Sequence, residues 1–149
     1  MGALILPTSG FVYVDTVTLI YTVETYSAYW PTLQPLWRAA QSGTLEVISS
    51  DLTLMEVLVG PLRNNDTALL ATYEAVLLGS DMRLLPVTQN VLREAARLRA
   101  TIPALRTPDA IHAATALLHG CALFVTNDTG FRRVPGLPIA ILDDVLAAP

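Results

Sequence analysis

Residues 105–131 read LRTPDAIHAATALLHGCALFVTNDTGF and combine the signals of a helix, a tight turn and a strand. Thr107-Pro108-Asp109 predicts a helix start, because threonine caps free backbone N–H groups and proline suits the first helical position. The helix is expected to run to His119 and to stop at Gly120, since glycine commonly ends helices. The apolar run Ala122–Thr126 then predicts a strand. A helix followed at once by a strand is half of the repeating unit of a parallel sheet.

The rest of the chain repeats this alternation. Short runs rich in β-branched residues predict strands, and longer runs with a helical apolar face predict helices. The prolines of Trp30–Pro35 are expected to interrupt the pattern. Together these segments predict one α/β domain over residues 1–149, with a mostly parallel central sheet of four to five strands and helices on both faces. The further expected strands are Phe11–Asp15, Leu45–Ser49, Met82–Val87 and Ile139–Leu142, and the further expected helices are Thr18–Tyr26, Gln34–Ser42, Asp51–Leu62, Thr67–Leu78 and Thr88–Ala100.

Composition narrows the class of protein. The chain has 149 residues, 52% of them hydrophobic, which suffices for a substantial core. No apolar stretch reaches the roughly 18–20 residues that span a bilayer, so no membrane association is expected. The start MGALILPTSG lacks the basic residues of a signal peptide. A single cysteine, Cys121, excludes an internal disulfide. These features predict a cytoplasmic protein.

The charged residues are few and unevenly chosen. All nine basic residues are arginines, so any mechanism that needs a catalytic lysine is excluded. The net charge of −4 at first argues against a nucleic-acid partner. If four of the 13 acidic residues bind a metal, however, 13 − 4 leaves nine acids against nine arginines. A polyanionic substrate therefore remains compatible with the overall charge.

Four carboxylates lie beside apolar runs, where a pattern of core packing alone would not place them: Asp15, Glu56, Asp109 and Asp128. An ionised carboxylate near a core is costly unless it is paired, hydrogen-bonded or bound to a metal. Each also has a simpler explanation. Asp15 and Asp109 suit helix starts, and Asp128 suits a turn. Glu56 would need an exposed stripe on its helix.

Element lengths predict that the four carboxylates meet. Asp15 closes the first strand, and Glu56 lies roughly 7–8 Å into the helix that follows the second. After Asp109 the chain runs about 16 Å along a helix and returns about 20 Å along a strand, so Asp128 comes back beside it. All four are thus expected at the carboxyl edge of one sheet, where sites form in such folds.

Hard oxygen ligands favour Mg²⁺ or Mn²⁺. We expect direct contacts from Asp15 and from one or two of Asp109 and Asp128, with Glu56 as a further ligand or as a residue that orients water. Phosphotransfer and receiver domains also gather aspartates at strand ends, but they rely on a lysine, which is absent. Phosphatases of the haloacid-dehalogenase type need a second aspartate where this chain has Val17.

Three segments carry a family resemblance: VYVDTVTLIYTVE (residues 12–24), SSDLTLMEVLVG (49–60) and residues 105–131. They resemble successive motifs of PIN-domain nucleases, most closely the VapC-like toxins of bacterial toxin–antitoxin pairs. The resemblance implies a PIN-like three-layer α/β/α sandwich that acts as a metal-dependent endoribonuclease on RNA and is neutralised by a cognate antitoxin. It carries the family's acidic residues onto Asp15, Glu56, Asp109 and Asp128. Family members often have serine or asparagine at the position of Val17, so a hydroxyl from Thr16 or Thr18 is expected to substitute.

Two alternatives stay open beside the toxin: a PIN-domain nuclease of RNA processing, and a catalytically silent PIN-like binding module. His112 lies three residues after Asp109 on the same helix face, so it could reach the site, although a packed or surface histidine is more common. A homodimer is expected to cover exposed apolar surface. Further candidates for RNA contact are the arginines Arg97, Arg99, Arg106, Arg132 and Arg133 and the aromatics Tyr26, Tyr29, Trp30 and Trp37.

Overall fold

The computed structural model describes residues 2–149, and its centre is a five-stranded sheet with the strand order β3-β2-β1-β4-β5. Every neighbouring pair of strands is parallel, so the sheet is wholly rather than mostly parallel. The sequence predicted four to five strands, and five are present in the sheet. The strands are β1 (Phe11–Val14), β2 (Glu46–Ser50), β3 (Met82–Leu85), β4 (Leu123–Thr126) and β5 (Ile139–Ile141).

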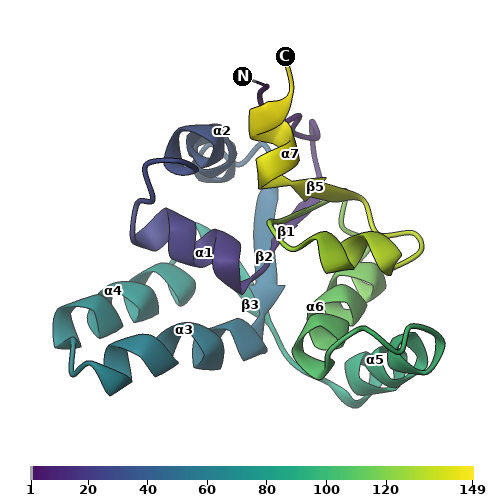
Figure 1. Cartoon of the computed structure of the whole chain (residues 1–149). Coiled ribbons are helices and arrows are strands. Elements are labelled where there is room, and N and C mark those ends of the chain that lie inside the picture. Colours follow the sequence, from purple (N-terminus) through teal and green to yellow (C-terminus); the bar gives the residue numbers. More distant parts are fainter. Residues whose placement is uncertain (1) are drawn as a thin grey trace.

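Helices cover both faces of the sheet, which confirms the three-layer α/β/α sandwich. Figure 1 shows α1 to α4 on one side of the sheet and α5 with α6 on the other. None of the helices within residues 2–149 is long and apolar enough to cross a membrane. The helices are α1 (Thr16–Val23), α2 (Trp30–Gln41), α3 (Asp51–Arg63), α4 (Thr67–Leu77), α5 (Gln89–Thr101), α6 (Thr107–Leu118) and α7 (Leu142–Ala147), with a 3₁₀ helix η1 at Thr129–Arg133.

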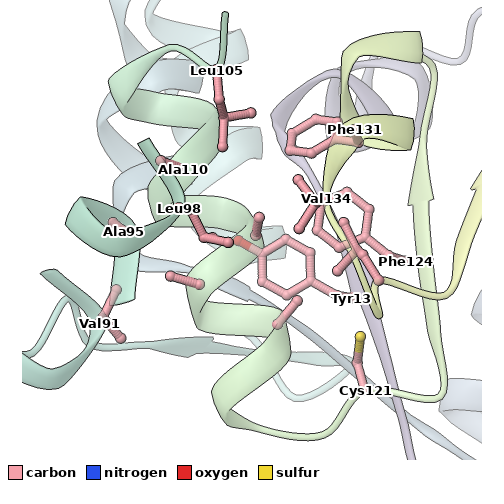
Figure 2. Packing of buried hydrophobic residues seen from close by; sticks show 14 of the residues in the cluster. Tyr13, Val91, Ala95, Leu98, Leu105, Ala110, Cys121, Phe124, Phe131 and Val134 are labelled. Atoms are coloured by element: carbon pink, nitrogen blue, oxygen red, sulfur yellow. The ribbon is translucent and has the colours of Figure 1, made fainter. Parts of the chain in front are cut away.

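Two hydrophobic cores follow from the alternation of side chains along the strands. Val12 and Val14 of β1 point into the core beneath α1 to α4, whereas Tyr13 points into the core beneath α5 and α6. Figure 2 shows the second core, in which the Tyr13 ring stacks on Phe124 with 4.9 Å between ring centroids. Phe131 from η1 also packs against Phe124, with 4.8 Å between ring centroids. The two cores fix the strands whose ends carry the site.

The expected break at Trp30–Pro35 is wrong, because α2 begins at Trp30 and runs through Pro35. Pro31 sits in the first turn, where a missing N–H costs nothing. Pro35 removes one backbone hydrogen bond inside the helix. Burial of Leu33, Leu36 and Trp37 outweighs that loss, since these side chains fill the core beneath α1 to α4.

Three smaller differences concern the ends of elements and one short extra helix. Thr107 is the first residue of α6 rather than its cap; the cap position belongs to Arg106, whose side chain makes no capping hydrogen bond. The last strand ends at Ile141, so Leu142 starts α7 instead of closing the strand. The helix η1 was also not expected from the sequence. These short elements depend on contacts with the sheet, which a local pattern does not contain.

Candidate active site

A cavity of about 200 Å³ opens where the first helical turns meet the carboxyl ends of β1 and β4. All four carboxylates singled out in the sequence line it, together with both residues that follow Asp15. The structure therefore places the four carboxylates at one edge of the sheet, as the element lengths predicted, while their catalytic role stays a prediction. The lining residues are Asp15, Thr16, Val17, Ile20, Glu56, Arg106, Asp109, His112, Asp128 and Phe131.

Asp15 is the most deeply buried of the four, with 5% of its surface exposed. It directly follows β1 and caps α1: its Oδ1 accepts from the backbone N of Thr18 at 3.2 Å and from the Thr18 hydroxyl at 2.8 Å. Its Oδ2 accepts from the Thr126 hydroxyl at 2.5 Å. Burial raises the pKa of Asp15, and the hydrogen bonds from Thr126 and Thr18 only partly oppose this. A positive charge in the cavity would therefore stabilise the ionised form.

Glu56 projects from α3 into a chain of hydrogen bonds. Its Oε1 accepts from the Thr16 hydroxyl at 2.7 Å and lies 2.7 Å from His112 Nε2. Burial alone would raise the pKa of Glu56, but the hydrogen bonds from His112 and Thr16, together with the nearby charge of Arg106, outweigh burial and lower it. Glu56 is therefore ionised at neutral pH. Both hydroxyls suggested for the position of Val17 contact site carboxylates, Thr16 on Glu56 and Thr18 on Asp15.

His112 connects the cavity to the core of the protein. It is 3% exposed, and its Nδ1 lies 2.6 Å from the hydroxyl of the fully buried Tyr13. Burial raises the pKa of Tyr13, so its hydroxyl stays protonated and can donate to Nδ1. The tautomer with hydrogen on Nε2 then donates to Glu56. Sequence spacing indicated that His112 could reach the site, but nothing in the sequence singled out Tyr13, whose apolar surroundings are those of a core residue.

Asp109 and Asp128 share one arginine. Asp109 lies in the first turn of α6, and Asp128 follows β4 and caps η1. Arg106 Nε donates to Asp109 Oδ2 at 3.1 Å, and Arg106 Nη2 lies 3.7 Å from Asp128 Oδ2. The guanidinium thus stands between two carboxylates from different elements. Asp109 and Asp128 also keep the local roles, helix start and turn, that explain each of them alone.

The donor chemistry of the cavity fits a hard divalent cation, because its acidic ligands are four carboxylates and no thiol lines it. Across residues 2–149, however, no three acidic, histidine or cysteine side chains already stand as a closed ligand cluster. Each carboxylate instead accepts a hydrogen bond from within the protein. Threonines donate to Asp15 and Glu56, Arg106 donates to Asp109, and the backbone N of Gly130 donates to Asp128 Oδ1 at 2.8 Å. Binding a cation would require some of these side chains, above all the exposed Arg106, to turn away.

Several other candidates from the sequence lie outside the cavity. Arg97 pairs with Glu94, and Arg132 pairs with Asp144. Trp37 is buried and donates its indole N–H to Thr22, so base stacking by Trp37 is excluded. Arg99 donates to the backbone oxygen of Leu105, and Tyr29 stacks on Tyr21 with 4.1 Å between ring centroids. These residues have structural partners, and Arg106 is the arginine among the described residues that line the cavity.

Comparisons with known proteins identify a domain family and several structures with a similar fold. The model of the PIN domain matches residues 12–137. Among solved structures, VapBC-5 from Mycobacterium tuberculosis, described as a member of a family of toxin–antitoxin systems, is 26% identical, with a TM-score of 0.57 over 91% of this chain and 98% of the other. VapBC2 from Rickettsia felis, bound to a promoter DNA fragment, has a TM-score of 0.68 at 16% identity over 88% and 98%.

A DNA-bound VapBC from Salmonella typhimurium is 22% identical, with a TM-score of 0.66 over 88% of this chain and 97% of the other. No curated protein matches the sequence. At identities of 16% to 26% these likenesses support the fold, whereas the PIN-domain match spans most of the chain. The chain belongs to the PIN-domain family.

Proposed function

We propose that this protein is a metal-dependent endoribonuclease that cleaves RNA phosphodiester bonds and serves as the toxin of a toxin–antitoxin pair. One observation carries the proposal: four carboxylates from four separate elements of a PIN fold line a single cavity at the carboxyl edge of the sheet. A structural role for each carboxylate explains one position at a time. It does not explain why all four face the same small volume.

Within this proposal Asp15, Asp109 and Asp128 hold Mg²⁺ or Mn²⁺. When bound, the cation supplies charge neutralisation at the phosphate and lowers the pKa of water. Asp15 contributes a carboxylate that is already oriented, since both of its oxygens accept hydrogen bonds from fixed threonines. Asp109 and Asp128 contribute carboxylates that are more accessible and adjustable.

Glu56 orients the attacking water. Its low pKa keeps the carboxylate ionised and able to accept a hydrogen bond. Thr16 and His112 both contact Oε1, so they set the orientation of the carboxyl group in the cavity. His112 is itself anchored to Tyr13, which belongs to the central strand β1. The proton-accepting group is thereby fixed to the rigid part of the fold.

A protein partner is supported by the surface of α3. Met55, Val59 and Leu62 are exposed, and their spacing places them along one face of the helix. We propose that a cognate antitoxin covers this face, as the likeness to toxin–antitoxin complexes suggests, and that the toxin otherwise pairs with a second copy. Light scattering of the protein with and without the co-expressed antitoxin tests this: a monomer whose mass is unchanged in both preparations contradicts it.

The decisive experiment compares RNA cleavage by the wild type, by Asp15→Asn and by Asp51→Asn. Asp51 is the control, because it is an exposed aspartate that starts α3 at the same edge of the sheet. We expect Mg²⁺ or Mn²⁺ to support cleavage by the wild type and by the control. EDTA should abolish both activities, and Asp15→Asn should be inactive with either metal. Equal cleavage by Asp15→Asn and the wild type, or cleavage that persists in EDTA, would overturn the assignment.

A further inference from the structure

Arg106 is the one permanently charged cation among the residues that line the cavity. Its guanidinium lies within ion-pair distance of Asp109 and of Asp128, through two different nitrogens. It therefore faces the same carboxylates that a divalent cation would need. No other arginine contacts any of the four site carboxylates in the described part of the chain.

The side chain of Arg106 can move while its backbone stays in place. The side chain is 75% exposed and makes no capping hydrogen bond to α6. The neighbouring Leu105 is buried in the core, and its backbone oxygen accepts from Arg99 Nε at 3.1 Å. Figure 2 shows Leu105 reaching from the loop before α6 toward the core. A fixed Cα with a long exposed stem allows the guanidinium to change partners without a cost in packing.

RNA binding creates a charge conflict in this cavity. A phosphodiester that enters meets four carboxylates, so at least some of their charge must be neutralised first. A guanidinium fork matches carboxylate and phosphate geometry equally well. Arg106 cannot use the same N–H groups for both anions at once. Its partner must therefore depend on what else holds Asp109 and Asp128.

We propose that Arg106 exchanges partners within the active site: it neutralises Asp109 and Asp128 in the metal-free protein, and it binds the scissile phosphate of RNA once a divalent cation holds those carboxylates. The exchange rests on the proposed function, because it requires a metal and an RNA substrate at this cavity. Exposed ion pairs are weak, so a doubly charged ion displaces the guanidinium readily. Arg106 is then the arginine of the cavity lining whose guanidinium is released to bind a phosphate.

The first test measures Mn²⁺ binding by calorimetry in the absence of RNA. Arg106→Gln removes the competitor for both carboxylates, so we expect Mn²⁺ to bind about threefold to tenfold more tightly than to the wild type. Arg106→Lys keeps the charge and should stay close to the wild type. Arg97→Gln is the matched control, because Arg97 also pairs with a carboxylate three residues away but lies outside the cavity; its Mn²⁺ affinity should not change.

The second test measures binding of a short single-stranded RNA of mixed sequence by fluorescence anisotropy, in Ca²⁺ and in EDTA. In Ca²⁺, Arg106→Gln should weaken binding and reduce the salt dependence by about 0.7 in the logarithmic slope, the value for one lost phosphate contact on a single strand. In EDTA, Arg106 is paired with the carboxylates and makes no phosphate contact, so the same substitution should leave the logarithmic salt slope unchanged. This dependence on metal separates a partner exchange from a fixed structural role.

The outcomes distinguish the exchange from the function on which it rests. Unchanged Mn²⁺ affinity in Arg106→Gln, or an equal drop of the salt slope in Ca²⁺ and in EDTA, would overturn the exchange while cleavage by the wild type keeps the proposed function. If the wild type binds no Mn²⁺ and cleaves no RNA, the proposed function and the exchange fall together.

Discussion

Replacing Tyr13 by phenylalanine tests whether the buried strand anchors the site. The substitution removes only the hydroxyl, and the ring keeps its stack on Phe124. His112 Nδ1, which lies 2.6 Å from that hydroxyl, then loses its partner where water has little access. Leaving a buried polar atom unsatisfied costs about 1–3 kcal/mol. At about 2–4 °C per kcal/mol for a chain of this size, a loss near 2 kcal/mol lowers Tm by about 4–8 °C.

Function should change with stability in this variant. Without Tyr13 to fix its ring, His112 no longer holds Glu56 Oε1 in one orientation. We therefore expect kcat for RNA cleavage to fall by about tenfold or more, as is usual when a supporting partner of a site carboxylate is lost. KM should change little, because Tyr13 and His112 are too buried to bind the RNA backbone. The assays are thermal unfolding by circular dichroism and initial cleavage rates well below the lowered Tm.

Tyr73→Phe provides the matched control. Tyr73 is also buried and donates to a carboxylate, but its acceptor Glu24 lies at the surface and can be hydrated after the change. The control should lose less stability than Tyr13→Phe and keep full activity. If both variants have the same Tm, or if Tyr13→Phe cleaves RNA at the rate of the wild type, the chain from Tyr13 through His112 to Glu56 does not position the site.

Three further predictions concern the carboxylates. Burial raises the pKa of Asp15 from 3.8, so its contribution to stability is full at acid pH and is lost as pH rises through the folded pKa. In EDTA, Asp15→Asn should therefore have a higher Tm than the wild type at pH 7 and the same Tm near pH 4. A difference in Tm that stays constant with pH contradicts this. Thr126→Val removes a hydrogen bond that lowers the pKa of Asp15; calorimetry should show Mn²⁺ affinity reduced by about tenfold or more, and equal affinity refutes the role of Thr126. Glu56→Gln keeps an acceptor for His112 but no charge, so single-turnover cleavage should slow by about 10²- to 10⁴-fold while Tm changes little; an unchanged rate would remove Glu56 from the mechanism.

Much of the fold follows from short-range pattern. Short apolar segments became the strands of the sheet, and Gly43, Gly120 and Gly136 adopt positive φ where the chain turns. The pattern failed at α2, where two prolines predicted a break in the chain. Burial of the apolar face nevertheless keeps the segment helical. The pattern also missed η1 and α7, which are too short to carry a periodic signal.

The candidate site was likewise predicted in part from the sequence and in part only by the structure. Strand and helix lengths were enough to bring Asp15, Glu56, Asp109 and Asp128 to one edge, because parallel strands end together. The partners of these carboxylates lie far away in sequence: His112 is 56 residues from Glu56, and Thr126 is 111 residues from Asp15. No local pattern contains such pairs.

By itself, then, the sequence determined the α/β class, the order of the elements and the four carboxylates, since these depend on periodicity, turn residues and element length. Only the tertiary structure decided how each carboxylate is held. Asp15 became a buried acid between two threonines, Glu56 an ionised acid beside a histidine, and Asp109 and Asp128 the shared partners of Arg106. The physical reason is that burial and hydrogen bonding, which set the charge and orientation of an acid, arise from neighbours that only folding brings together.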